Sequence, residues 1–174
     1  MKIAIIGYSG SGKSTLAKHL GALYRLPVLH LDTLQFLPGW VERTREEKRA
    51  DLARFLDENE GGWVIDGSYL KILPERRFSE ADRILFLDFP RLVCLFRVLR
   101  RYRTFRGRTR DSIAPGCPER LSAEFLLWVL FRGRTGKKRR QFRDILAAYP
   151  EKVRVLRTQR AIDRYLTECK GETV

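Results

Sequence analysis

The chain has 174 residues, 44% of them hydrophobic, which is enough for one buried core but too short for two ordinary domains. Its 35 Lys and Arg against 21 Asp and Glu give a net charge of +14, which favours polyanionic partners: a nucleotide, nucleic acid or an anionic membrane surface. No apolar stretch has the length of a membrane span or signal peptide, and the three cysteines lack zinc-site spacing and disulfide density. We therefore expect a single cytoplasmic domain over 1–174.

Apolar runs and helical periodicity alternate along the first part of the chain. The short β-branched run at 2–6 ends at a glycine, as buried parallel strands do, and leucines at helical spacing predict a helix at 13–24. A second buried strand is predicted at 27–31. A charged helix is predicted at 42–60, and a Gly-Gly pair ends it before a third strand at 63–67.

The same alternation continues in the second part of the chain, around one irregular segment. A fourth strand is predicted at 82–88, and Pro90 can begin the next helix. The composition of 106–117, rich in Gly, Arg, Thr, Asp and Pro, is typical of a mobile loop. The remaining predicted elements are helices at 121–131 and 141–148, a fifth strand at 152–156 and a helix at about 161–169. Five strands alternating with helices predict an α/β fold, a three-layer α/β/α sheet with parallel pairing through right-handed crossovers.

Residues 7–15, Gly-Tyr-Ser-Gly-Ser-Gly-Lys-Ser-Thr, fit the P-loop pattern G-x-x-x-x-G-K-[ST] between a predicted strand and a predicted helix. A glycine-rich turn is the alternative. In a P-loop, backbone N–H groups and the N-terminal end of the helix bind phosphate. Lys13 should contact the β- and γ-phosphates, and Ser14 should ligate Mg²⁺ with Thr15 in support. The predicted site for ATP and Mg²⁺ comprises Gly7, Ser9, Gly10, Ser11, Gly12, Lys13, Ser14 and Thr15.

Three aspartates follow predicted buried strands, where open α/β sheets form their ligand crevice. Asp66 is the best candidate for orienting Mg²⁺ beside Ser14. Asp32 could accept a proton from the acceptor group or hold its hydroxyls. A helix-cap or turn role is the alternative for both, and Asp88 fits either interpretation. His30 is expected near the site without an assigned role.

Two basic clusters lie in the second half of the chain. On a closing lid, guanidinium groups would neutralise the charge of a transferred phosphoryl group and exclude water. Solvated helix faces or a nucleic-acid footprint could account for most of these basic residues, so we expect only about three or four of the arginines and lysines to contact substrate. The clusters are Arg97, Arg100, Arg101, Arg103, Arg106, Arg108 and Arg110, and then Arg132, Arg134, Lys137, Lys138, Arg139, Arg140 and Arg143.

With these residues the chain resembles the adenylate kinase-like branch of the nucleoside monophosphate kinase fold and, more closely, small bacterial proteins labelled DNA topology modulation protein. The resemblance implies a five-stranded parallel sheet, an acceptor-binding insert at about 33–60 and an arginine-rich lid at about 103–140. It is carried by 7–15, His30-Leu31-Asp32, Leu37-Pro38-Gly39-Trp40, Trp63-Val64-Ile65-Asp66-Gly67, Asp88-Phe89, 97–102 and Thr158-Gln159-Arg160.

The resemblance also implies roles for individual residues. Arg97 and Arg101 match the paired arginines that enter the lid of such kinases, and Arg97 and Gln159 would complete the nucleotide site. The expected catalytic residues are Lys13, Asp32, Asp66, Arg97, Arg101 and Arg134.

The sequence thus predicts ATP-dependent phosphoryl transfer to a small acceptor, a nucleotide or nucleoside-like molecule, near Asp32, Trp40 and Arg43. Kinases specific for AMP carry Thr-Gly after the second strand, where this chain has Asp32-Thr33, which argues against AMP. The alternative is a nucleic-acid-binding regulatory ATPase that affects DNA topology. The acceptor, any non-specific binding of nucleic acid and the oligomeric state stay open.

Overall fold

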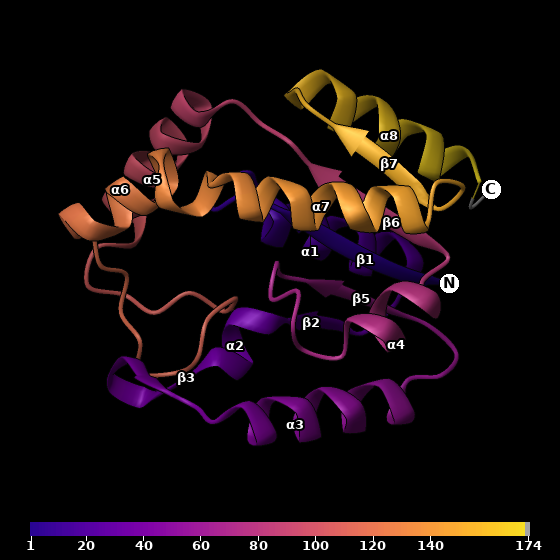
Figure 1. Ribbon diagram of the computed structural model, residues 1–174, viewed down its shortest axis with the longest axis horizontal. Helices are drawn as coiled ribbons and strands as arrows, with labels where there is room; N and C mark the ends of the chain where they lie inside the picture. The colour runs from indigo at the N-terminus through magenta and orange to yellow at the C-terminus, as the bar shows by residue number, and fades with distance from the viewer. Residues whose placement is uncertain (173–174) are drawn as a thin grey trace.

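Five parallel strands form the central sheet of the structure, a computed structural model that describes residues 1–172 (Figure 1). The strand order is β2-β5-β1-β6-β7, so the first strand of the chain lies in the middle of the sheet. Every pairing is parallel, which confirms the predicted α/β fold. The strands are β1 (Lys2–Gly7), β2 (Val28–His30), β5 (Trp63–Asp66), β6 (Arg83–Leu87) and β7 (Val153–Leu156).

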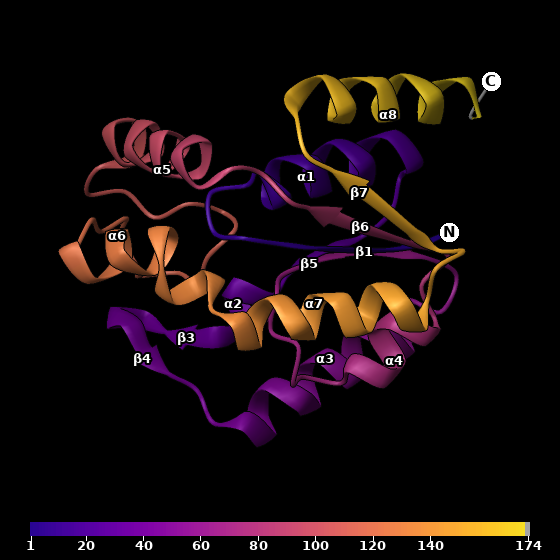
Figure 2. The same cartoon turned by 45° about the horizontal axis from the view of Figure 1, so that its top comes forward.

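Helices cover both faces of the sheet and complete the three predicted layers, as Figure 2 shows. The helices α1 (Lys13–Tyr24) and α8 (Gln159–Gly171) lie on one face. The other face is covered by α3 (Arg45–Glu58), α4 (Pro74–Ser79) and α7 (Gly136–Ala148).

The residues of β1 explain why both faces need helices. Successive side chains of a strand point to opposite faces, so Ile3 and Ile5 enter the core under α1 and α8, whereas Ala4 and Ile6 enter the core on the other side. All four are fully buried. Burial of each isoleucine contributes roughly 1.5–3 kcal/mol relative to exposure to water.

The remaining elements lie at the end of the sheet that is formed by the carboxyl ends of the strands. Figure 2 shows α5 (Arg91–Phe105) and α6 (Ala123–Leu130) beside this edge. The segment after β2 forms α2 (Leu31–Gln35) and a hairpin of β3 (Phe36–Leu37) and β4 (Val41–Glu42). Two 3₁₀ turns occur at Pro38–Trp40 and Arg132–Arg134. Within residues 1–172, no helix is both long and apolar enough to cross a membrane.

Several boundaries differ from those that the sequence predicts. The helix expected from 42 begins at Arg45, because Thr44 and Glu47 form a capping box. The helix expected from 141 begins at Gly136, after Thr135, whose side chain caps it. We did not predict α2, α4 or the hairpin, since elements of two to six residues are too short for a periodic pattern.

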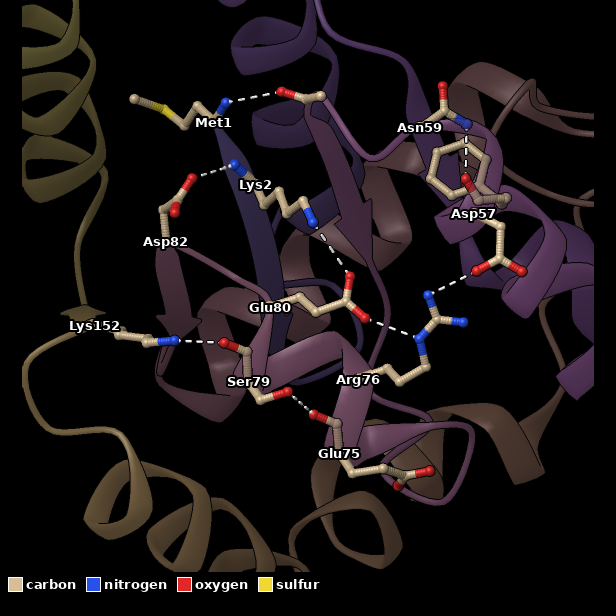
Figure 3. Close-up of polar contacts among 12 residues, drawn as sticks. Met1, Lys2, Asp57, Asn59, Glu75, Arg76, Ser79, Glu80, Asp82 and Lys152 are labelled. Atoms are coloured by element: carbon tan, nitrogen blue, oxygen red, sulfur yellow. Dashed lines mark hydrogen bonds and ion pairs between the residues drawn. The ribbon is translucent and has the colours of Figure 1, made fainter.

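Polar contacts stabilise the opposite end of the sheet, where the strands begin (Figure 3). The backbone N–H of Lys2 donates to Asp82 Oδ2 at 2.6 Å, and Lys2 Nζ lies 3.3 Å from Glu80 Oε2. Arg76 donates to Glu80 and to Asp57, each at 2.8 Å. These contacts connect β1 to α4 and α3.

Candidate active site

The P-loop connects β1 to α1 through a backbone path that needs glycine. Gly7 and Gly10 have φ values of 147° and 79°. A Cβ on Gly7 would lie 2.5 Å from Leu87 O, and one on Gly10 would lie 2.5 Å from Cys94 O. No residue other than glycine fits at these two positions without displacing β6 or α5. Its backbone N–H groups and the N-terminal end of α1 are therefore held in a fixed arrangement for phosphate.

Lys13 begins α1 and turns back over the loop. Its Nζ donates to Tyr8 O at 3.0 Å. Burial lowers the pKa of Lys13, and the negative charges of Asp32 and Asp66 oppose that shift. The ammonium group thus lies in a sheltered position where a phosphate could replace Tyr8 O as its partner.

Asp66 joins the P-loop to the second strand. It ends β5, in register with Ile5 and His30, and is 4% exposed. Ser14 Oγ donates to Asp66 Oδ2 at 2.9 Å, and His30 Nδ1 contacts Asp66 Oδ1. Hydroxyl and carboxylate oxygens suit Mg²⁺, so this pair fits the predicted ion. No group of three or more His, Cys, Asp or Glu that could hold a metal occurs in residues 1–172, so an ion here would need water and phosphate oxygens as its other ligands.

Asp32 lies in α2, just beyond the end of β2. Tyr69 Oη donates to Asp32 Oδ1 at 2.7 Å. Burial, together with the charge of Asp32, raises the pKa of Tyr69 far above its ordinary value, so the phenol keeps its proton. The fully buried Arg77 fixes the loop that carries Tyr69, donating to Tyr69 O at 2.9 Å and to Gly67 O at 2.8 Å. Burial lowers the pKa of Arg77 to about 10.

Arg97 connects the P-loop to the segment after β7. Its Nη1 donates to Ser11 O at 2.7 Å and its Nη2 donates to Gln159 Oε1 at 2.9 Å. The guanidinium carbon lies 4.2 Å from the centre of the Phe89 ring. Two residues that the sequence assigns to nucleotide binding, Arg97 and Gln159, are thus in contact beside the P-loop.

Arg101 forms a cluster with Arg110, from the same predicted basic group, and with Glu119, which we did not single out from the sequence. Arg101 Nη2 lies 2.7 Å from Glu119 Oε1, and Arg110 Nε lies 2.6 Å from Glu119 Oε2. Glu119 is 6% exposed. Burial lowers the pKa of Arg101, the charge of Arg110 lowers it further, and Glu119 opposes both effects. Arg101 and Arg110 line a cleft of about 270 Å³ together with Ser14 and Thr15.

Arg134 is buried against the P-loop. Its Nη2 donates to Phe89 O at 2.8 Å and to Cys94 Sγ at 3.2 Å, and its guanidinium carbon lies 3.7 Å from the centre of the Tyr8 ring. It therefore contacts the segment that follows β6, α5 and the P-loop. A role with substrate would require this side chain to change partners.

The segment 106–117, predicted as a mobile loop, packs against the hairpin. Gly39 N donates to Gly116 O at 3.0 Å, and Cys117 Sγ donates to Leu37 O at 3.3 Å. A small apolar cluster joins the two segments and consists of Ile113, Ala114, Cys117, Phe36 and Trp40. The loop and the hairpin are thus in direct contact across the end of the sheet.

Other candidate residues have protein partners. Asp88 pairs with Arg157 at 3.3 Å near the surface. Arg43, expected beside the acceptor, pairs with Asp51 at 2.6 Å. The structure therefore brings together Lys13, Ser14, Asp66 and Asp32, and leaves Asp88 outside this group.

The sheet order and the P-loop can now be compared with known structures. TT1252 from Thermus thermophilus matches with a TM-score of 0.58 and 19% identity, over 100% of this chain and 98% of that chain. A gluconokinase from Sinorhizobium meliloti 1021 matches with a TM-score of 0.53 and 15% identity, over 99% of this chain and 90% of that chain. The chain shares its overall α/β fold with these two proteins. No protein-family model and no curated protein sequence matches it.

Proposed function

We propose that the chain is an ATP-dependent phosphotransferase that transfers the γ-phosphoryl group of ATP to a small molecule, a nucleotide or nucleoside-like compound. The observation that carries the proposal is the contact between Ser14 and Asp66 beside Lys13, at the point where the P-loop enters α1. A hydroxyl, a carboxylate and a half-buried ammonium group in this arrangement are the parts that P-loop enzymes use to bind Mg²⁺ and polarise the γ-phosphate.

Each residue of the site has a distinct task in this proposal. Ser14 and Asp66 would hold Mg²⁺, which when bound neutralises phosphate charge, and His30 would orient Asp66. Lys13 would stabilise the charge that develops on the phosphoryl oxygens, assisted by Arg101 and, after a change of partners, by Arg134.

Arg97 and Gln159 would contact the nucleotide beside the P-loop. We assign acceptor binding to the insert at about 33–60 and water exclusion to the lid at about 103–140, within one domain over 1–174. The contact between the hairpin and the segment 106–117 supports this assignment, because it joins the insert to the lid directly. A kinase that depends on ATP belongs in the cytoplasm, where we place it.

A regulatory ATPase that binds nucleic acid and affects DNA topology is the second candidate. The observation in its favour is the exposure of arginines at the end of α5 and after it, including Arg100, Arg103, Arg106 and Arg108. Such side chains bind phosphates without regard to sequence. They lie outside the buried site, so binding of DNA would not replace the small acceptor.

The experiment is an ATP-consumption screen with Mg²⁺ against nucleoside monophosphates, nucleosides and duplex DNA. Turnover that depends on a small acceptor and yields a phosphorylated product supports the kinase. ATP hydrolysis that DNA stimulates and no small molecule changes would favour the second candidate. Failure of the protein to bind ATP would reject both.

A further inference from the structure

The charges around Asp32 restrict the acceptor. Asp32 Oδ1 accepts the hydrogen bond of Tyr69, whereas Oδ2 has no hydrogen-bond partner within residues 1–172. The charge of Asp32 raises the pKa of two cations, Lys13 and Arg101, and the proposed function assigns both to the phosphoryl group of ATP. The carboxylate therefore presents one free oxygen beside the place of phosphoryl transfer.

Three cations of the acceptor side are already engaged by protein groups. Arg77 is fully buried and bonded to backbone carbonyls. Arg43 is paired with Asp51. Lys48 is buried, and its Nζ donates to Gln35 Oε1 at 3.2 Å and lies 3.3 Å from Glu42 Oε1. None of these three could bind an acceptor phosphate without losing a protein partner.

The two arginines that line the cleft, Arg101 and Arg110, leave little positive charge there for a second anion. Arg101 and Arg110 share the single carboxylate of Glu119, so the three side chains together carry one net positive charge. That charge faces the cleft lined by Ser14 and Thr15, on the side of the P-loop. ATP would engage it before any acceptor could.

We infer that the group phosphorylated by this chain is an alcohol hydroxyl of a molecule that carries no phosphate where it meets Asp32, such as a nucleoside or a polyol. The inference rests on the proposed function and narrows it, since a nucleoside monophosphate would bring a dianion next to the Asp32 carboxylate, whose neighbouring cations Lys13 and Arg101 are assigned to ATP. Repulsion between these charges at contact distance in a partly buried site lowers affinity by more than about tenfold.

The transfer step balances with the groups present. The acceptor oxygen forms a bond to the γ-phosphorus while the bond from that phosphorus to the β–γ bridging oxygen breaks. The hydroxyl proton passes to Asp32 Oδ2, and ADP leaves with the bonding electrons. Tyr69 acts as a positioning residue, because its hydrogen bond holds Oδ1 and turns Oδ2 toward the acceptor.

Binding tests the charge argument without knowledge of the natural acceptor. The protein is saturated with Mg²⁺ and a non-hydrolysable ATP analogue, and AMP or UMP is then titrated by calorimetry. The wild type should show no saturation up to about 10 mM, and Asp32→Asn should gain at least about tenfold in affinity for the monophosphate. The control is Asp144→Asn, the same change at an exposed position of α7, which should have no effect. Submillimolar binding of AMP or UMP by the wild type, or no gain in Asp32→Asn, would overturn the inference.

Product chemistry gives an independent test. The ³¹P spectrum after incubation with ATP and each of four nucleoside monophosphates should contain no new nucleoside diphosphate, whereas the matching nucleosides and glycerol are tested for a phosphomonoester signal. Conversion of any monophosphate to its diphosphate refutes the inference but not the proposal that the chain is a kinase. Failure to bind the ATP analogue at all refutes the proposed kinase activity, so the two failures are distinguishable.

Discussion

Removal of the charge of Glu119 should destabilise the protein far more than removal of another lid carboxylate. Glu119 is buried and is the common partner of Arg101 and Arg110, at 2.7 and 2.6 Å. Glu119→Gln leaves two guanidinium groups facing each other without a counter-charge. Loss of one partner from a buried ion pair costs about 3–5 kcal/mol. For a chain of this length, that cost lowers the melting temperature by roughly 6–20 °C.

The matched control is Glu124→Gln. Glu124 lies in α6, mostly exposed, 3.7 Å from Arg132, which is also exposed, so its loss should change the free energy of unfolding by less than about 0.5 kcal/mol. Urea unfolding of both variants gives the comparison, and phosphate or sulfate should restore part of the stability of Glu119→Gln by replacing the missing anion. Equal stability of the two variants would refute the claim that Glu119 neutralises this cluster.

The remaining predictions concern metal, acceptor and DNA. Asp66→Asn should weaken Mg²⁺ binding and lower turnover with any acceptor, and excess Mg²⁺ should restore part of that turnover. Asp32→Asn should keep its affinity for nucleotide and Mg²⁺ but lose acceptor-dependent turnover. An equal loss of Mg²⁺ affinity in both variants would contradict this division of roles. Tyr69→Phe should lower kcat about tenfold with ATP affinity unchanged, and a purely structural role would instead appear as a lower melting temperature alone. Binding to DNA should be non-specific, depend on 100–110 and 137–143, and weaken steeply with salt; sequence-selective binding at high salt would contradict it.

The sequence predicted the sheet well because its signals are local. Apolar runs such as Trp63-Val64-Ile65 can only be buried strands in this alternation, and the glycines of 7–15 specify a P-loop wherever they follow such a strand. The spatial meeting of Ser14 and Asp66 followed from the rule that parallel strands end at one edge.

The partners of the charged residues could not be predicted in the same way. Tyr69 reaches Asp32 across 37 positions of sequence, and Glu119 lies in a segment whose composition indicates a mobile loop. Helical spacing places an arginine on a face but does not name the carboxylate or carbonyl that it meets. The packing of Arg134, a predicted catalytic residue, on the Tyr8 ring is one such contact that the sequence does not indicate.

The central claim is that Lys13 acts on the phosphoryl group of ATP, and the turnover of Lys13→Met tests it most directly. ATP consumption is measured beside the melting temperature and the affinity for an ATP analogue. Because the lysine acts mainly on transition-state charge, turnover should fall by several orders of magnitude while the fold and melting temperature stay nearly unchanged. Turnover within about tenfold of the wild type, in a folded variant, would contradict the assignment of this chain as a P-loop phosphotransferase.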